Sequence, residues 1–336
     1  MSSPGTYGFL NAKVRTRRSR LLDLETCRAM AQASSLQEAC TLLSRNVHFR
    51  DAEKFRHREE WEIDHEITRA EIRDLRSLKK GIKGAFADYL TRLLERIDIQ
   101  RLKQLIRARH NSSTPFMRDG AVYDFPADAM LEAGSLDSFA AGLESTPFHE
   151  TFRRFRTGTE IRHFDLEVAL DRLGFQRLWE STRSFSESDR EIARRFLGVE
   201  ADLWNLQAVT RYREYTGIPV EEFPRIVLPY GHWVPAEEWV RIAEGRPLPE
   251  KIRKQLSITA LPVKPGDDVK SRQMLEQILW EVLRDEAEQV FSGFPFSVGV
   301  LAGYTVLLRL QSFRVRLILQ GKRMNLPAET ILHRLV

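Results

Sequence analysis

Cysteine is scarce in this sequence, and the two residues present, Cys27 and Cys40, exclude two common architectures. Two thiols cannot build a disulfide framework, nor can they supply the four ligands of a structural zinc site. The chain also has no low-complexity linker, and its first residues, MSSPGTYGF, contain no apolar signal region. These absences predict a protein of the reducing cytoplasm that is not secreted.

The sequence motifs of catalysis are missing as well. There is no phosphate-binding G-x-x-x-x-G-K-[ST] loop, no G-x-G-x-x-G after a strand and no G-x-S-x-G nucleophile elbow. The short cluster Gly81-Ile82-Lys83-Gly84 follows a predicted helix, so we interpret it as a turn. We therefore expect a protein that is not an enzyme and that has no catalytic residues.

Metal and cofactor sites are not indicated either. His57 and His65 flank an acidic helix, but they fall on different turns and no third ligand converges with them. Three glutamates, Glu62, Glu167 and Glu276, recur at similar places along the chain. Such repeated carboxylates more often pair with arginine than act together in acid–base chemistry. We expect no metal and no cofactor.

One run of residues, 291–308, carries no charge and has to be tested as a membrane span. Its length only just reaches that of a bilayer core, and Pro295, two serines and a tyrosine interrupt it. We interpret it as a buried helix, in which Gly299 and Gly303 lie closely against another helix. The sequence therefore predicts no membrane span.

Charge is abundant and mixed. Among 336 residues, 52 are Lys or Arg and 47 are Asp or Glu, which gives a net charge of +5. A basic chain can bind nucleic acid, but here the basic residues alternate with acidic ones along predicted helix faces, which is typical of a solvated helix surface. Nucleic acid is therefore not an expected partner.

Helical periodicity is the strongest pattern in the sequence. The same order of elements recurs three times, at intervals of roughly a hundred residues. The first element is a helix that ends in basic residues, at 10–17, 102–109 and 205–213, with a fourth copy at 314–318. The second is a turn before a short helix, and the third is an acidic amphipathic helix around Glu62, Glu167 and Glu276.

No segment alternates apolar and polar residues for long enough to form a strand, so the predicted fold class is all-α. Single helices are expected at 51–80, 86–109, 164–178 and 187–215, a loop at 111–128 and a linker at 259–268. We expect three quasi-repeated helical lobes that form a funnel-like body. Their predicted limits are 1–110, closed by the C-terminal helix, then 111–215, and 216–336 with the closing C-terminal helices.

The repeated turns are the candidate partner-binding residues. They are Ser34 and Ser35, Gly134 and Ser135, and Gly231 and His232. Glycine and serine at these places would let the backbone of a partner approach closely, although the same residues also serve as simple helix caps.

Several motifs together resemble the C subunit of the A/V-type rotary ATPases, which is equivalent to the d subunit of the eukaryotic V-ATPase. The resemblance runs nearly end to end. Its motifs are YGFLNAKVR at 7–15, DLEVALDR at 165–172, EADLWNL at 200–206, RLIL at 316–319 and LPAETI at 326–331. One departure is clear: Arg309, Gln311, Arg314 and Val315 stand where the family usually has Glu-x-Glu-x-x-Asn-Leu.

The resemblance implies a non-catalytic central-stalk component of a V-type ATPase or ATP synthase. A component of this kind couples the soluble rotor shaft to the membrane proteolipid ring for ATP-linked transport of protons or sodium ions. The expected partners are the shaft proteins and the ring, and the expected location is cytoplasmic and peripheral to the membrane. An alternative is a helical-repeat adaptor that binds peptide or nucleic acid through its basic N-terminal third, and another is a helical enzyme that uses the repeated glutamates with a metal.

Overall fold

The computed structural model describes residues 4–154, 163–215, 218–247, 249–255 and 269–335. Every regular element in these ranges is helical, which confirms the all-α class. The α-helices are α1 (Pro4–Arg18), α2 (Leu24–Gln32), α3 (Leu36–Ser44), α4 (Glu60–Lys79), α5 (Gly84–His110), α6 (Ala127–Glu132), α7 (Leu136–Ala141), α8 (His149–Arg154), α9 (His163–Ser181), α10 (Glu187–Tyr215), α11 (Phe223–Ile226), α12 (Ala236–Ala243), α13 (Glu250–Gln255), α14 (Val269–Gln289), α15 (Gly299–Arg323) and α16 (Ala328–Leu332). Three 3₁₀ helices are η1 (Ala52–His57), η2 (Thr182–Ser184) and η3 (Val220–Glu222).

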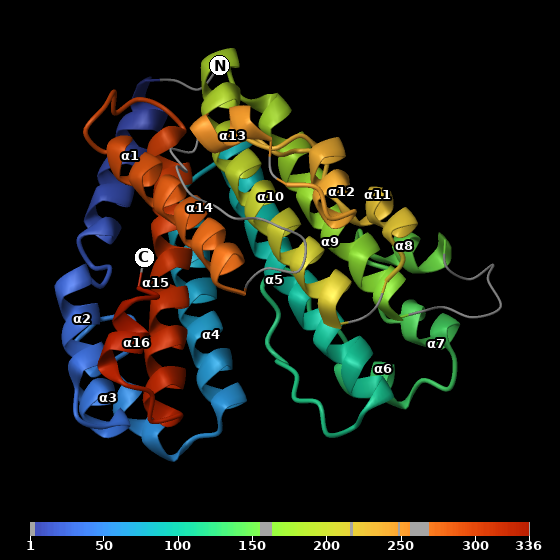
Figure 1. Cartoon of the computed structure of the whole chain (residues 1–336), viewed down its shortest axis with the longest axis horizontal. Helices are drawn as coiled ribbons and strands as arrows, with labels where there is room; N and C mark the ends of the chain where they lie inside the picture. The colour runs from blue at the N-terminus through green and yellow to red at the C-terminus, as the bar shows by residue number, and fades with distance from the viewer. Residues whose placement is uncertain (1–3, 155–162, 216–217, 248, 256–268, 336) are drawn as a thin grey trace. The chain divides into compact units, whose positions relative to one another are not determined.

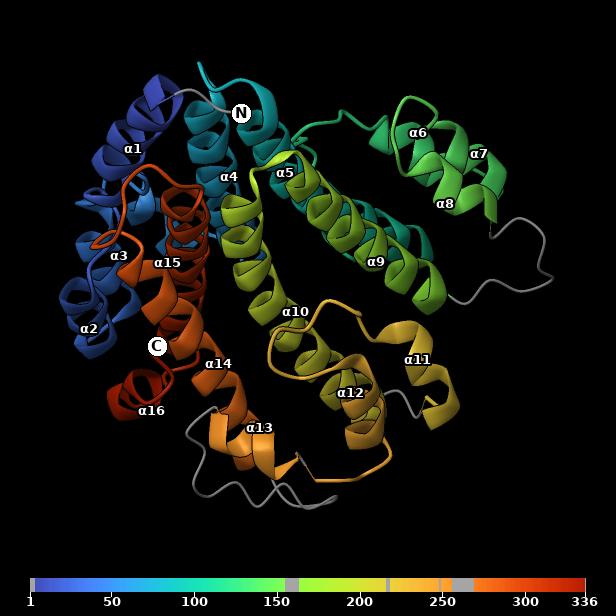
Figure 2. The ribbon, with the colours of Figure 1, turned by 90° about the horizontal axis from the view of Figure 1, so that it is seen from above.

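The helices form two compact units. The first contains residues 1–71 and 185–336, and the second contains residues 72–184. In the second unit α5 and α9 lie side by side along their length, as both views show (Figures 1 and 2). Phe139, Phe148 and Phe152, from the segments of short helices, pack into one core with Leu102, Leu105 and other residues of the long helices.

The first unit contains both the N-terminal and the C-terminal segments of the chain. Helix α15 packs between α1 and α14, and its C-terminal half lies against α2 and α3 (Figure 1). Val315, Ile318 and Leu319 of α15 share one buried core with α2, α3, α4 and α16. Residues more than two hundred positions apart in the sequence therefore complete each other's apolar faces.

The long helix predicted at 51–80 is shorter than expected. The chain forms η1 at 52–57, becomes extended at Arg58, and begins α4 only at Glu60. Ala52 and Phe55, three positions apart, are both buried in the core of the first unit, and a 3₁₀ turn of three residues places them on one face. Burial of these two side chains interrupts a segment whose charge pattern alone favours a continuous helix.

The other predicted helices agree within a few residues, and α2 and α3 are separated at the serines as expected. Gly81 and Gly84 have φ values of 80° and 63°, so the predicted turn between α4 and α5 uses the left-handed region that favours glycine. The predicted linker at 259–268 lies outside the described residues.

The charge-free run at 291–308 is divided between a loop and the first turns of α15, whose residues Val300–Leu308 are all buried. Among the helices that the structure describes, none is long and apolar enough to cross a membrane. Close packing at both glycines is confirmed. A Cβ atom at Gly303 would lie 2.6 Å from Val290 Cγ2, just after the end of α14, and 2.9 Å from the carbonyl oxygen of Ala287 in its last turn.

This close contact between helices gives a first prediction. Gly303→Ala should lower the free energy of unfolding by about 1–3 kcal/mol, because the overpacked helices must separate and this outweighs the gain in helix propensity of about 1 kcal/mol. Urea unfolding measures the change. Gly293→Ala is the control, since its added Cβ would meet only ordinary contacts at 3.8 and 3.9 Å. Equal stability of the two variants would contradict the packing described here.

Candidate functional site: three anchored turns

Three long helices each carry a buried acceptor that binds the loop leading into a short helix. In the second unit the carboxylate of Asp98 on α5 accepts hydrogen bonds from the backbone N–H groups of Ala121, Val122 and Tyr123, at 2.7, 2.7 and 3.1 Å. These residues lie just before α6. A loop that enters the core needs partners for its N–H groups, and a single carboxylate supplies them here.

The second copy of this arrangement is built on Asp202 of α10. Its carboxylate accepts from the N–H groups of His232, Trp233 and Val234 at 3.0, 2.7 and 3.4 Å, just before α12. The indole N–H of Trp239 adds a fourth bond at 3.2 Å. Burial raises the pKa of Asp202 to about 6, even though the donors around it favour the charged form.

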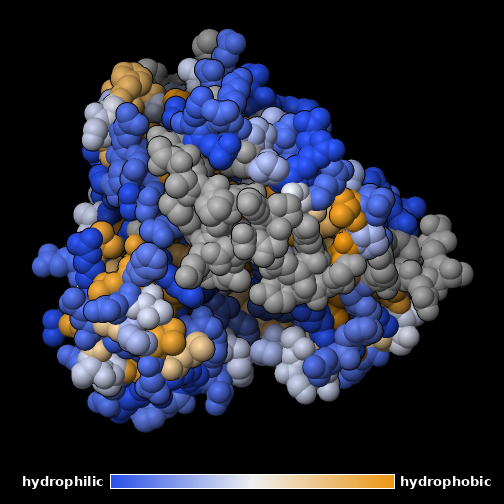
Figure 3. Space-filling model, in the orientation of Figure 1, coloured by the Kyte–Doolittle hydropathy of each residue, from blue (hydrophilic) through white to orange (hydrophobic). Residues whose placement is uncertain are grey.

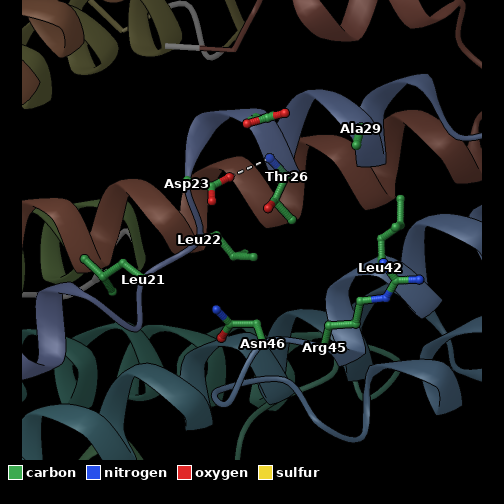
Figure 4. Close-up of a pocket in the computed structure, with 9 residues that line it drawn as sticks. Leu21, Leu22, Asp23, Thr26, Ala29, Leu42, Arg45 and Asn46 are labelled. Atoms are coloured by element: carbon green, nitrogen blue, oxygen red, sulfur yellow. Dashed lines mark hydrogen bonds between the residues drawn. The ribbon is translucent and has the colours of Figure 1, made fainter.

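The third copy is Gln311 on α15, whose Oε1 accepts from the N–H of Leu22 at 2.8 Å, just before α2. A neutral amide replaces the carboxylate here, and it accepts one backbone N–H where the other two copies accept three. Beside this loop is a cavity of about 360 Å³, onto which side chains of residues 21–23, α2 and the end of α3 face (Figure 4). We refer to Asp98, Asp202 and Gln311 as the loop anchors.

The loop anchors on α5 and α10 are each followed, at the same distance, by a second residue that holds the loop. Three positions on, Arg101 donates to the carbonyl oxygens of Met117, Arg118 and Tyr123, and Asn205 exchanges two hydrogen bonds with the backbone of Leu228. The third equivalent residue, Arg314, is buried on α15, and burial lowers its pKa.

Five positions after each loop anchor, a polar side chain bonds to an acidic residue of the helix alongside. Lys103 Nζ donates to Asp171 of α9 at 2.6 Å, and Gln207 donates to Glu276 of α14 at 2.7 Å. Arg316 forms an ion pair with Asp64 of α4. Each loop anchor is thus part of a set in which one helix holds both a loop and a second long helix.

Two of the predicted turns are held by the same long helices. Eleven positions after its loop anchor, Lys322 donates to the carbonyl oxygen of Ala33 at 2.5 Å, and Arg109 donates to that of Ala133 at 3.2 and 3.3 Å. These carbonyls begin the turns that contain Ser34 and Ser35, and Gly134 and Ser135. Both turns are therefore fixed to the long helices, and not only to the short helices beside them.

Both turns also cap the helix that follows. Ser35 Oγ accepts from the Glu38 N–H at 3.2 Å. The Glu38 carboxylate accepts from the hydroxyl and the backbone N–H of Ser34, and these bonds lower the pKa of Glu38. Ser135 Oγ accepts from the Ser138 N–H at 3.1 Å. Space around Gly134 is open, since an added Cβ would have no neighbour within 4 Å.

The third predicted turn is not equivalent to the other two. Gly231 and His232 lie before α12, next to the N–H groups that Asp202 binds, so they match the loop before α6 and not the turn after it. A Cβ at Gly231 would lie 2.3 Å from the Val234 carbonyl oxygen and 2.5 Å from Asp202 Oδ1. Glycine is needed there for the internal packing of the loop, a role that the sequence comparison of the turns missed.

The repeated glutamates do not converge. Glu167 pairs with Arg107, Glu276 accepts from Gln207, and Glu62 accepts from the backbone N–H of Glu59. His57 is on η1 and His65 on α4. Within the described part of the chain, no group of three or more His, Cys, Asp or Glu side chains is arranged to hold a metal ion.

The sequence departure at 309–315 has a structural explanation. Arg309 of α15 forms an ion pair with Glu200 of α10, whose side chain is almost fully buried. Both residues lie two positions before a loop anchor, so equivalent positions of two copies face each other across two packed helices. An arginine at 309 therefore brings a positive charge to a buried carboxylate.

The fold and its anchored turns define a helical scaffold whose polar residues serve to hold its own loops. Comparison with known proteins agrees with this. The model of the ATP synthase (C/AC39) subunit family matches residues 10–334, and the chain belongs to that family, whose members are non-catalytic components of rotary ATPases.

Relatives from archaea have low identity but long coverage. The chain is 22% identical to the C subunit of the A-type ATP synthase of Methanosphaera stadtmanae, over 97% of this chain and 86% of that protein. It is also 22% identical to the C subunit of Methanococcoides burtonii, over 99% of this chain and 95% of the relative. The C subunit of Thermococcus gammatolerans is 23% identical over 67% of this chain and 61% of its own length.

The buried state of Asp202 gives a second prediction. Because its pKa is higher in the folded protein than in the unfolded chain, the folded state holds this proton more tightly between about pH 4 and 6. The stabilising contribution is complete below the unfolded pKa of 3.8 and is lost as the pH rises through about 6. The difference corresponds to roughly 3 kcal/mol.

Asp202→Asn removes this titration while keeping the shape of the side chain. The free energy of unfolding of the wild type relative to the variant should therefore fall by about 2–3 kcal/mol from pH 4 to pH 7. Chemical denaturation of both proteins across that range measures it. A difference that is constant with pH would show that Asp202 titrates at the same pH in the folded and unfolded states.

Proposed function

We propose that this chain couples the soluble rotor shaft of an A-type ATP synthase to the proteolipid ring in the membrane. The observation that carries the proposal is the family match over residues 10–334. The polar side chains described above support it, because they hold loops and neighbouring helices together. The chain would then be a cytoplasmic, peripheral member of the complex and would support ATP-linked proton or sodium transport mechanically. No observation favours the alternative adaptor that binds peptide or nucleic acid.

A part that transmits torque must resist bending, and the anchored turns supply a physical basis for this. Each loop anchor ties a loop to the middle of a long helix, and the residue five positions on ties that helix to another. Close-packed helices with satisfied internal hydrogen bonds have low compressibility. In each set the loop thus becomes part of the stiff helical body around it.

The three sets also support the proposed division into three lobes, with limits near 1–110, 111–215 and 216–336, around a funnel. Loop anchors at 98, 202 and 311 recur at the intervals seen for the sequence elements. Helix α15 supplies the third anchor to the loop before α2, in agreement with a first lobe that the C-terminal helix closes. Similar lobes would present similar inner surfaces to a shaft.

Copurification tests the proposed function directly. The tagged chain, expressed in its own organism, should be recovered from solubilised membranes together with the shaft proteins, the ring and the nucleotide-binding subunits. It should remain bound to the ring when the soluble shaft is stripped away. Recovery of the chain alone, or with unrelated soluble proteins, would contradict a coupling role.

The turn at Gly134 offers a sharper test of where partners bind. Gly134→Trp adds a large side chain into open space, so the thermal midpoint should stay within a few degrees of the wild type. If this turn contacts the shaft or the ring, the variant should assemble at least tenfold less well, because a bulky side chain blocks close backbone approach. Quantitative recovery with the complex measures the effect.

Ser184→Trp is the matched control, because Ser184 is an exposed residue of the same unit outside the anchored turns. Its assembly should equal that of the wild type. Gly231 is unsuitable for this experiment, since any side chain there meets Asp202 and disturbs the fold. Normal assembly of the Gly134 variant would remove this turn from the partner surface.

A further inference from the structure

Three phenylalanines are exposed together at one end of the first unit. Phe294 is 71% exposed, Phe296 46% and Phe9 50%. The first two belong to the loop that joins α14 to α15, and Phe9 belongs to α1. The rings of Phe294 and Phe296 meet edge to face at 5.6 Å, and Phe296 approaches the Cβ position of Gly8 to 3.9 Å. Figure 3 shows hydrophobic residues on the surface where Figure 1 places this loop.

The loop is held firmly, so the exposure of its rings is a property of the folded unit. Arg15 Nη2 donates to the Phe291 carbonyl oxygen at 2.7 Å, and the Arg18 guanidinium lies 4.3 Å from the centre of the Phe291 ring. At its other end, the Val298 N–H donates to the buried carboxylate of Asp189 at 2.7 Å. Both ends of the loop are thus fixed to helices, and the two phenylalanines project between them.

The N-terminal segment that carries Phe9 is basic. Residues 1–22 contain five basic residues, Lys13, Arg15, Arg17, Arg18 and Arg20, and no acidic residue. Lys13 Nζ lies 5.4 Å from the centre of the Phe9 ring. Two acidic residues contact this part of the chain: Glu288 pairs with Arg18, and Asp189 accepts from Tyr7 and Val298. We name Phe9, Lys13, Phe294 and Phe296 the aromatic corner.

We propose that the aromatic corner rests on the surface of a membrane that contains anionic lipid. Aromatic rings that project next to basic residues suit the headgroup region, where the rings enter the acyl boundary and the cations meet lipid phosphates. A protein partner is less well matched, because aromatic anchors at protein interfaces fill pockets and these rings stand on a projecting loop. The proposal rests on the proposed function only in that it requires the chain to work beside a membrane.

Vesicle flotation with the full-length chain tests this contact without any other protein. The chain should float with vesicles of phosphatidylcholine and phosphatidylglycerol, bind pure phosphatidylcholine much less, and be released by high salt. Phe294→Ala with Phe296→Ala should weaken binding by about tenfold, because the two rings that would enter the membrane are lost. Lys13→Gln should weaken it by about fivefold, the effect of removing one cation.

Matched controls lie on α2 and just after the C-terminal ends of α3 and α15. Arg28→Gln with Arg45→Gln removes two exposed cations there, and Val47→Ala with Met324→Ala removes two exposed apolar side chains. Both controls should bind vesicles like the wild type. Circular dichroism and thermal midpoints check that every variant is folded.

The outcomes separate this inference from the proposed function. Absence of vesicle binding, or binding that the aromatic variants do not change, overturns the inference. If the chain joins the ATPase complex but binds no protein-free vesicle, its contact at this corner is with a protein and only the inference fails. If it binds vesicles through the aromatic corner but never copurifies with an ATPase, the coupling function fails and the lipid contact stands.

Discussion

The need of buried backbone N–H groups for partners is the constraint on which this structure depends. Long helices satisfy their own backbone, but the loops between them do not, and here three such loops turn toward the interior. Asp98 and Asp202 each meet that need with one carboxylate that accepts three consecutive N–H groups. The carboxylates lose hydration on burial, and this loss raises the pKa of Asp202 to about 6 although the hydrogen bonds that it accepts oppose the rise.

Much of the helical architecture could be predicted from the sequence, because it follows from local patterns. Helical periodicity located α5, α9 and α10, and the serine pair located the break between α2 and α3. The end of α4 at Lys79 is marked by glycines with positive φ. The start of α4 could not be predicted in the same way, since it depends on the burial of Ala52 and Phe55 in a core built from both ends of the chain.

The candidate site was predictable only in part. The caps at Ser35 and Ser135 follow from residue type and spacing, whereas the equivalence of Gly231 with them does not hold. The loop anchors left a signal in the sequence that was visible but easy to miss. Glu200-x-Asp202-x-x-Asn205 and Arg309-x-Gln311-x-x-Arg314 occupy matching places on α10 and α15, and Asp98 with Arg101 repeats the spacing on α5. A search for internal repeats of polar residues would have found them.

The same internal equivalence explains how this chain can differ in charge from the pattern it resembles without losing the fold. Position 309 is an arginine, and its ion-pair partner Glu200 is the residue at the equivalent place of another copy. With a glutamate at 309, two carboxylates would meet at this contact, and one of them would need a proton or another cation.

Gln311 fits the same argument, because a neutral acceptor suits a loop that offers one N–H, while three donors are enough to hold a carboxylate. In each copy the charge of the acceptor therefore follows the number of donors that its loop presents.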